Sequence, residues 1–293
     1  MTKAHKSGFV NIIGCPNVGK STLMNAMVGE RLSIITSKAQ TTRHRIMGIV
    51  SGSNYQVVFS DTPGIIKPLY KLQEKMMQFV ITAFADADLF LLITDVFEDI
   101  KLEESFLEKL QKTKTPILLL INKIDISGQE KVEEKIKEWH QKLPKAEILA
   151  ISAIQRFNLD KIMNRIIELL PAGEAFYDKN EFTDKPERFF VSEIIREKIL
   201  LSYRKEIPYS VEVVVNSFKD EPEIIRMQAD ILVERDSQKG IIIGDKGAAL
   251  KKVGTAARKE MEDFFGKKVF LELFVKVDKD WRNNERRLEN FGY

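Results

Sequence analysis

The run Gly14-Cys15-Pro16-Asn17-Val18-Gly19-Lys20-Ser21 constrains the fold of this chain more than any other sequence feature. It follows the strand-like segment Phe9–Ile13 and leads directly into the amphipathic stretch Ser21–Val28. A glycine-containing loop between strand and helix lets the backbone wrap a phosphate, and the first helix amides direct positive dipole at the anion. An ordinary glycine-rich connection is the alternative, but the pattern arises by chance in only about 1 in 100 chains of this length. The sequence therefore predicts a phosphate-binding loop.

Within this loop the chemistry assigns separate tasks to the last residues. Lys20 is expected to reach the β- and γ-phosphates, and the Ser21 hydroxyl to bind Mg²⁺. Thr22 and the remaining loop residues would line the phosphates with their backbone. A nucleoside triphosphate held with Mg²⁺ is therefore the expected ligand.

The segment Asn122-Lys123-Ile124-Asp125 predicts which base is bound. It follows the buried strand-like run Ile117–Ile121. An ionised Asp125 only accepts hydrogen bonds, so it can pair with the ring N–H and the amino group of guanine, donors that adenine does not present. Lys123 can lay its aliphatic stem over the base, and Asn122 can tie this segment to the phosphate loop. We expect GTP and GDP rather than ATP.

Two further segments complete the predicted nucleotide site. Asp61-Thr62-Pro63-Gly64 follows the strand-like run Gln56–Ser60, so Asp61 is expected to hold Mg²⁺ through water and the Gly64 amide to sense the γ-phosphate. The neighbouring Ile65 is included in the predicted GTP site. Ser152-Ala153, after Glu147–Ala150, is expected to place a backbone amide near the guanine oxygen.

A polar stretch, Gln40–Arg45, is expected to be the first switch segment, with one threonine completing the Mg²⁺ shell in the GTP state. We favour Thr42 over Thr41, and a polar loop without a metal role stays open for either residue. The predicted metal ligands are Ser21, Thr42 and Asp61. The groups predicted to act at the reacting phosphate are Lys20, Ser21, Thr42, Asp61 and Gly64.

The order of elements predicts an α/β fold with two modules. Strand-like and helical stretches alternate up to residue 173, which is typical of a P-loop doubly wound sheet with helices on both faces. The polar residues 174–186 are expected to form a linker. Residues 187–293 then follow the order helix, two strands, helix pair and strand, which predicts a smaller α+β domain.

The second module contains the loop Ile243-Gly244-Asp245-Lys246-Gly247 between two helical stretches. Two glycines at this spacing allow a close approach to a nucleic-acid backbone. Lys246, Lys251 and Lys252 could contact phosphates, whereas Asp245 should repel them. A plain helix–helix turn with a solvated lysine face is the alternative.

Composition limits the broader class of protein. Hydrophobic residues make up 44% and charged residues 30% of the 293 residues, as in soluble globular proteins. The single Cys15 excludes an intramolecular disulfide and favours a reducing, cytoplasmic setting. The apolar runs are shorter than the roughly 20 residues of a membrane span, and the N-terminus has no signal-peptide core. The net charge of +3 does not by itself argue for nucleic acid.

The nucleotide motifs resemble those of the small GTPases, and the helix–strand–strand–helix–loop–helix–strand order resembles the type II KH domain. From about Phe9 to Tyr293, including Ser192–Lys198 and the tail around Trp281, the chain is similar to the Era family of GTPases. The resemblance implies binding to the 3′ end of small-subunit (16S) ribosomal RNA during 30S assembly. It also implies some peripheral association with the cytoplasmic face of the inner membrane. A monomer is expected.

The sequence departs from the GTPase pattern at two places. Ile65 stands where a water-orienting glutamine is common, and Arg156-Phe157 where the family usually has glycine. In some relatives with this loop, the asparagine holds a potassium ion, and we extend this hypothesis to Asn17. The sequence predicts a Mg²⁺-dependent GTPase switch that binds RNA. An RNA-binding scaffold that senses nucleotide, with incidental hydrolysis, is the alternative, and an ATPase is disfavoured by Asp125.

Overall fold

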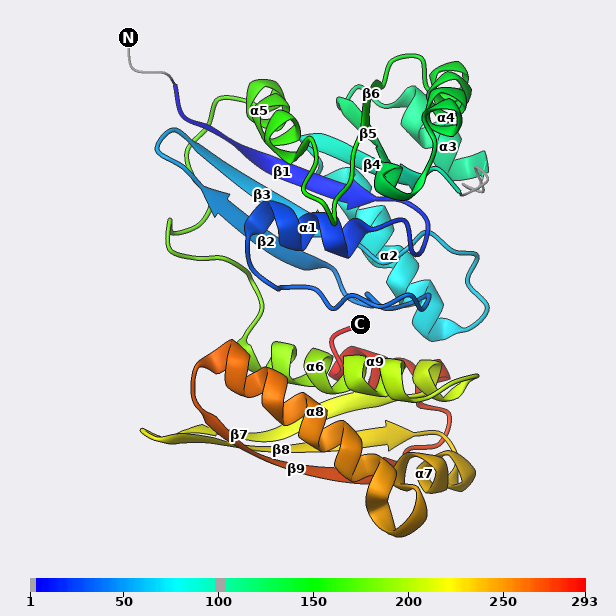
Figure 1. The fold of residues 1–293 in the computed structure, drawn as a ribbon, viewed down its shortest axis with the longest axis vertical. Helices are drawn as coiled ribbons and strands as arrows, with labels where there is room; N and C mark the ends of the chain where they lie inside the picture. The colour runs from blue at the N-terminus through cyan, green and yellow to red at the C-terminus, as the bar shows by residue number, and fades with distance from the viewer. Residues whose placement is uncertain (1–3, 98–103) are drawn as a thin grey trace. The chain divides into compact units, whose positions relative to one another are not determined.

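Six strands of the first part of the chain form one sheet, in the order β2-β3-β1-β4-β5-β6. The computed structural model describes residues 4–97 and 104–293 (Figure 1). All neighbours pair in parallel except the edge strand β2, which is antiparallel to β3. The strands are β1 (Lys6–Ile13), β2 (Ile46–Ser51), β3 (Tyr55–Asp61), β4 (Leu89–Asp95), β5 (Ile117–Asn122) and β6 (Glu147–Ala150). The predicted α/β class is confirmed, and the segments Phe9–Ile13, Gln56–Ser60, Ile117–Ile121 and Glu147–Ala150 lie in β1, β3, β5 and β6 as expected.

The strand β2 was not predicted, and Gly48 gives the reason. A glycine in the middle of a strand weakens the β signal. A Cβ at Gly48 would lie 2.7 Å from Val28 Cγ2 on the helix above, so close packing requires the glycine. The packing that requires this residue cannot be seen in the local sequence.

Helices cover both faces of this sheet (Figure 1). They are α1 (Lys20–Val28), α2 (Lys71–Ala85), α3 (Glu104–Lys112), α4 (Gln129–Lys142) and α5 (Leu159–Leu169), with a short 3₁₀ turn, η1 (Ile124–Ile126). On one face, Leu92 and Leu119 of the sheet form a core cluster with Leu110 of α3 and Trp139 of α4. The amphipathic stretch Leu102–Gln111 predicts a helix here, and its start at Leu102 lies outside the described residues. Because nonpolar side chains are buried on both faces, the central strands are almost continuously apolar.

Residues 174–184, which we call the strap, run along the edge of this sheet without forming a helix or strand. The Ile49 amide of β2 donates to Phe182 O at 2.9 Å, and the Met47 amide donates to Asp184 Oδ1 at 3.1 Å. The strap therefore supplies acceptors to the outer side of β2. The first compact unit accordingly extends to Asp184, beyond the module end at residue 173 that the sequence suggests.

The other end of the strap is fixed by one buried side chain. The Gln56 amide oxygen accepts from the amides of Phe176 and Tyr177 at 2.7 and 3.0 Å, and its nitrogen donates to Tyr177 O at 2.9 Å. The ring of Phe176 also packs on Phe9, with centroids 4.9 Å apart. Polar composition predicts a linker here, but these contacts hold the strap on the sheet.

The second unit is a three-stranded sheet in the order β7-β8-β9. Figure 1 shows α6 and α8 side by side on one face of this sheet, and the two helices are in contact. The elements are α6 (Glu187–Ser202), η2 (Ile207–Tyr209), β7 (Glu212–Asp220), β8 (Ile224–Val233), α7 (Asp236–Ile243), η3 (Asp245–Gly247), α8 (Ala248–Phe265), β9 (Lys268–Val277), η4 (Trp281–Asn283) and α9 (Glu285–Asn290). The predicted α+β arrangement is confirmed, while η4 and α9 were not predicted.

The C-terminal tail is part of the fold of the second unit. Trp281 and Leu288 are fully buried, and Trp281 Nε1 donates to Ser210 O at 3.2 Å. The Tyr293 hydroxyl donates to Glu212 Oε2 at 2.8 Å.

Among the described residues, no helix is both long and apolar enough to cross a membrane.

Candidate functional site

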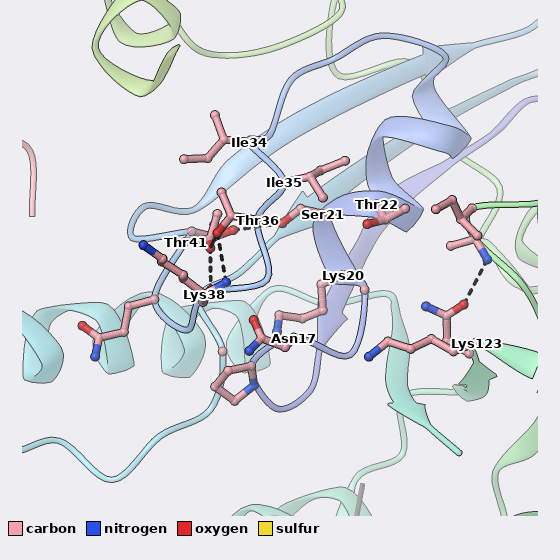
Figure 2. A pocket seen from close by; sticks show the side chains of 18 of the residues that line it. Asn17, Lys20, Ser21, Thr22, Ile34, Ile35, Thr36, Lys38, Thr41 and Lys123 are labelled. Carbon is pink, nitrogen blue, oxygen red and sulfur yellow. Dashed lines mark hydrogen bonds between the residues drawn. The ribbon is translucent and has the colours of Figure 1, made fainter. Parts of the chain in front are cut away.

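A cavity of about 330 Å³ lies in the first unit, beside the phosphate loop and the segment that follows β5 (Figure 2). Crevices at the carboxyl ends of parallel strands are the usual ligand sites of such sheets. Its lining includes these predicted residues: Pro16, Asn17, Gly19, Lys20, Ser21, Thr22, Thr41, Thr42, Gly64, Asn122, Lys123, Asp125 and Ala153. The structure thus brings together motifs that are more than 100 residues apart in the sequence.

Other predicted residues are not on the cavity wall, namely Gly14, Cys15, Val18, Asp61, Thr62, Pro63, Ile65 and Ser152. Gln40 of the predicted switch segment also lines the cavity, whereas sequence reasoning missed Ile34, Ile35, Thr36, Lys38, Ile126 and Ile154 as lining residues. Four of these lie just before the predicted switch segment, where no motif marks them. Only their position between α1 and the switch threonines could have suggested them.

Two glycines of the phosphate loop are fixed by their surroundings. Gly14 and Gly19 have φ values of 151° and 103°, which favour glycine. A Cβ on Gly14 would lie 2.2 Å from Ile93 O, and one on Gly19 would lie 2.2 Å from Asn122 Nδ2. The Lys20 ammonium donates to the carbonyls of Gly14 and Cys15 at 3.1 and 2.7 Å. The loop therefore closes around the Lys20 ammonium at the start of α1.

Three oxygen-bearing side chains converge next to the loop. Ser21 Oγ donates to Asp61 Oδ2 at 2.7 Å and lies 2.9 Å from Thr42 Oγ1. Thr42 Oγ1 also donates to the same Asp61 oxygen at 3.4 Å. Thr41, in contrast, donates to Lys38 O at 2.6 Å and lies 2.7 Å from Thr36 Oγ1 (Figure 2). The arrangement favours Thr42 as the switch threonine.

The Asp61 carboxyl is completely buried, and its Oδ1 has no hydrogen-bond partner in the described chain. Burial raises the pKa of Asp61, while the Lys20 charge and nearby hydroxyls of Ser21, Ser33 and Thr42 act to lower it. A hard cation with oxygen ligands would offset this burial cost and use the unpaired oxygen. The residues therefore fit Mg²⁺.

The base-reading segment is held by a chain of hydrogen bonds. Asn122 Nδ2 donates to Val18 O at 2.8 Å, which joins the segment to the phosphate loop as predicted. Lys123 Nζ lies 2.5 Å from Asp95 Oδ2, a buried carboxylate at the end of β4 that sequence reasoning did not identify. Asp125 is exposed on the cavity wall. The carboxylate is thus accessible to a purine base.

The Ser152-Ala153 segment is bonded to the base-reading segment. The Ala153 amide lines the cavity and donates to Asn122 Oδ1 at 2.9 Å, a hydrogen bond that sequence reasoning did not identify. The Asn122 side chain thus accepts from the Ala153 amide through its oxygen and donates to Val18 O through its nitrogen. Arg156, in the place where glycine was expected, has a φ of 56°. The loop thus keeps a left-handed turn without the glycine.

The segment after β3 holds its side chains inward. Thr62 Oγ1 donates to Ile12 O at 2.8 Å, and a Cβ on Gly64 would lie 2.8 Å from Pro16. Ile65 is only 5% exposed, and its amide donates to Gly14 O at 3.1 Å. A buried aliphatic side chain cannot orient water, as the sequence predicted.

The glycine loop of the second unit has a conformation that only its glycines adopt easily. Gly244 and Gly247 have φ values of 70° and 81°. Lys246 also has a positive φ, of 46°. The buried Tyr203 hydroxyl donates to Ile242 O at 2.7 Å, immediately before the loop. Burial raises the pKa of Tyr203, so the phenol remains a donor.

A groove of about 340 Å³ lies beside this loop, along α8 and β9. Of the predicted RNA residues, Gly247 and Lys251 line it, whereas Ile243, Gly244, Asp245, Lys246 and Lys252 do not. The sequence missed Leu250, Gly254, Thr255, Arg258, Leu271 and Leu273. Their spacing along α8, with alternate residues on β9, is the signal that could have found them. An apolar floor with basic edges suits bases flanked by phosphates.

Comparisons with known families agree with this division. Residues 9–123 match the family described as 50S ribosome-binding GTPase. Residues 206–282 match the KH domain family. The two matches fall on the two units, and each contains the loop described above.

Relatives match nearly the whole chain. GTPase Era of Staphylococcus epidermidis is 43% identical over 291 residues, 99% of this chain and 97% of the relative. The chloroplastic GTPase ERA1 of Zea mays is 45% identical and covers 99% of this chain and 71% of the relative.

Two solved structures have the same fold. A crystal structure of Era with MgGDPNP and nucleotides 1506–1542 of 16S ribosomal RNA has a TM-score of 0.94 and 38% identity, covering 99% of both chains. A variant of Aquifex aeolicus Era bound to GDP and AlF₄⁻ has a TM-score of 0.94 and 39% identity, covering 98% of this chain and 99% of the other. With its GTPase and KH units in this order, the chain belongs to the Era family of GTPases.

Proposed function

We propose that the cavity of the first unit binds GTP with Mg²⁺ and hydrolyses it, and that the second unit binds the 3′ end of 16S ribosomal RNA during 30S assembly. The observation that carries the first part is the convergence of Ser21, Thr42 and Asp61 beside the phosphate loop. One oxygen of the Asp61 carboxyl, Oδ1, has no hydrogen-bond partner among the described residues. The relative solved with MgGDPNP and ribosomal RNA supports both parts. We propose residues 1–173 as the GTPase module and 187–293 as the KH module, with the segment 174–186 between them packing on the first unit as far as Asp184.

In this proposal Mg²⁺ is held by Ser21, Thr42 and, through water, Asp61. The bound ion neutralises charge on the β- and γ-phosphates. Lys20 pairs with the same phosphates, and the loop amides surround them. The Gly64 amide contacts the γ-phosphate. When hydrolysis removes that phosphate, the segment that contains Gly64 is released.

Guanine recognition depends on Asp125. Replacing it with Asn should weaken GTP binding about 100-fold, because two hydrogen bonds to a charged acceptor are changed. Xanthine nucleotides should gain affinity, since they present an acceptor where guanine has a donor. Calorimetric titration with both nucleotides tests the assignment, and unchanged GTP affinity in Asp125→Asn contradicts it.

Potassium binding at Asn17 is the finer part of the proposal. Asn17 is exposed on the cavity wall with a φ of 66°, between the phosphate loop glycines. A cation there would place positive charge by the phosphates without an arginine. Single-turnover hydrolysis should be faster in potassium than in sodium, and Asn17→Ala should remove the difference. Equal rates in the two salts with the unaltered protein contradict this role.

The buried Ile65 favours a second candidate function. Because this side chain cannot orient water, the protein could act as an RNA-binding scaffold that senses nucleotide, with hydrolysis incidental. Complementation of small-subunit assembly by Lys20→Ala and Gly244→Asp separates the two. If only Gly244→Asp fails, the scaffold is correct; if both fail, the nucleotide cycle is required.

RNA binding is tested directly by titrating labelled 16S 3′-end RNA with protein loaded with a GTP analogue or with GDP. A difference in affinity of about ten-fold corresponds to about 1.4 kcal/mol of coupling. A monomer and a peripheral association with the cytoplasmic side of the membrane rest on the family resemblance alone. Light scattering and co-sedimentation with anionic vesicles test these two expectations.

A further inference from the structure

Ser33 is a buried serine for which sequence analysis gave no role. Its side chain is 1% exposed, and its Oγ has no hydrogen-bond partner among the described residues. A buried hydroxyl without a partner is unfavourable, and alanine would fill the same space without that cost. The hydroxyl therefore indicates a ligand that bonds to it.

The backbone of Ser33 is held in place by Asn25. The Ser33 amide donates to Asn25 Oδ1 at 2.9 Å, and Asn25 Nδ2 donates to Ser33 O at 2.7 Å. The Leu32 amide also donates to Asn25 Oδ1, at 3.0 Å. The amide and the carbonyl of Ser33 thus both have hydrogen-bond partners, and among the described residues only its hydroxyl lacks one.

The helix α1 explains where this hydroxyl is placed. Asn25 follows Ser21 by four residues, so both side chains lie on the same face of the helix. Asn25 therefore brings Ser33 back toward the Ser21 side. Consistent with this, the Ser33 hydroxyl faces the Asp61 carboxyl and acts to lower its pKa, although no bond between the two side chains has the distance and angle of a full hydrogen bond.

Two buried oxygens without partners, Ser33 Oγ and Asp61 Oδ1, consequently lie in one small region with Ser21 and Thr42. Mg²⁺ keeps several waters when proteins bind it, and those waters need hydrogen-bond partners. We propose that Ser33 is a positioning residue of the Mg²⁺ site, whose hydroxyl bonds to a water of the metal. This inference rests on the proposed Mg²⁺ site and adds a residue outside its motifs.

The test measures dissociation of fluorescently labelled GDP from the full chain across a range of free Mg²⁺ concentrations. Ser33→Ala should raise the half-saturating Mg²⁺ concentration about 5- to 10-fold, as expected for one hydrogen bond to a metal-bound water. Affinity for GDP without Mg²⁺ should not change. Ser33→Thr, which keeps the hydroxyl, should restore most of the Mg²⁺ response.

Ser37→Ala is the matched control, because Ser37 is exposed on the same segment and does not line the cavity. It should leave the Mg²⁺ response unchanged. Ser33→Cys keeps the size of the side chain with a weaker donor, so it replaces Ser33→Ala if that variant does not fold. Thermal unfolding of each variant checks the fold.

Asp61→Asn separates failure of this inference from failure of the metal site. If Asp61→Asn loses the Mg²⁺ response and Ser33→Ala keeps it, the role of Ser33 is wrong and the site stands. An unchanged Mg²⁺ response in Asp61→Asn overturns the site and this inference together. If Ser33→Ala weakens Mg²⁺-free GDP binding equally, Ser33 is only structural.

Discussion

The two units each present a loop that ends in a left-handed glycine directly before a helix. Gly19 precedes α1 with a φ of 103°, and Gly247 precedes α8 with a φ of 81°. Their surroundings differ. A Cβ at Gly19 would meet Asn122 at 2.2 Å, whereas one at Gly247 would meet nothing within 4 Å. Similar local conformations are thus enclosed by a sheet in one unit and open in the other.

The difference concerns how each loop is held. The phosphate loop is bonded to the ends of other strands, through Asn122 to Val18 and through Ile65 to Gly14. The glycine loop of the second unit is bonded to the helix before it, through Gly244 N to Gly240 O, and follows the Ile242 carbonyl that accepts from Tyr203. We therefore expect a pre-formed phosphate loop and a more adaptable glycine loop, and substitutions in the two loops should differ in severity.

The largest effect is expected for Gly19→Ala. The new methyl group would displace Asn122, which joins the base-reading segment to the loop, so GTP affinity should fall by about 100-fold or more. Calorimetric titration measures this, with RNA binding by the second unit as the internal control. An affinity within a few-fold of the original would show that the loop is not enclosed as described.

A smaller effect is expected for Gly244→Ala. Its Cβ would lie 2.6 Å from the Ala249 Cβ, and the positive φ adds strain of about 1–2 kcal/mol. RNA affinity should fall about 10- to 30-fold, while GTP affinity stays constant. Fluorescence anisotropy with labelled 3′-end RNA measures the change. Equal loss of GTP affinity would mean that the variant has perturbed more than the loop.

Gly247→Ala isolates the cost of conformation alone, because no atom obstructs the new methyl group. The strain of about 1 kcal/mol should reduce RNA affinity by about five-fold. The same anisotropy assay applies, with the unaltered protein measured in parallel. If Gly247→Ala lowers RNA affinity as much as Gly19→Ala lowers GTP affinity, the backbone φ decides the effect of the substitution. The atoms around each glycine would then not explain the difference between the two loops.

The smallest effect is expected for Tyr203→Phe. It removes the hydrogen bond to Ile242 O and leaves a buried carbonyl without this donor, at a cost of about 1 kcal/mol. RNA affinity should decrease about three-fold, and chemical denaturation should show a matching loss of stability. Unchanged RNA affinity would show that Tyr203 supports the fold without positioning the loop.

Sequence patterns predicted the parts of the site that depend on local chemistry. Each nucleotide motif follows a strand, so the parallel sheet brings Asn122 and Asp125 to the phosphate loop, as expected from their order. The role of Ser33 could not be predicted, because its position depends on the side chain of Asn25. The hydrogen bond from the Ala153 amide to Asn122 Oδ1 could not be predicted for a similar reason. Side-chain bonds between distant segments leave no periodic signal.

The strap has a practical consequence for dissecting the molecule. Edge strands with bare amides pair readily with strands of other molecules. A protein cut after residue 173 would lose the acceptors that Phe182 and Asp184 offer to β2, and it should self-associate. A protein that ends after residue 184 should remain monodisperse, because the strap then still covers the outer side of β2.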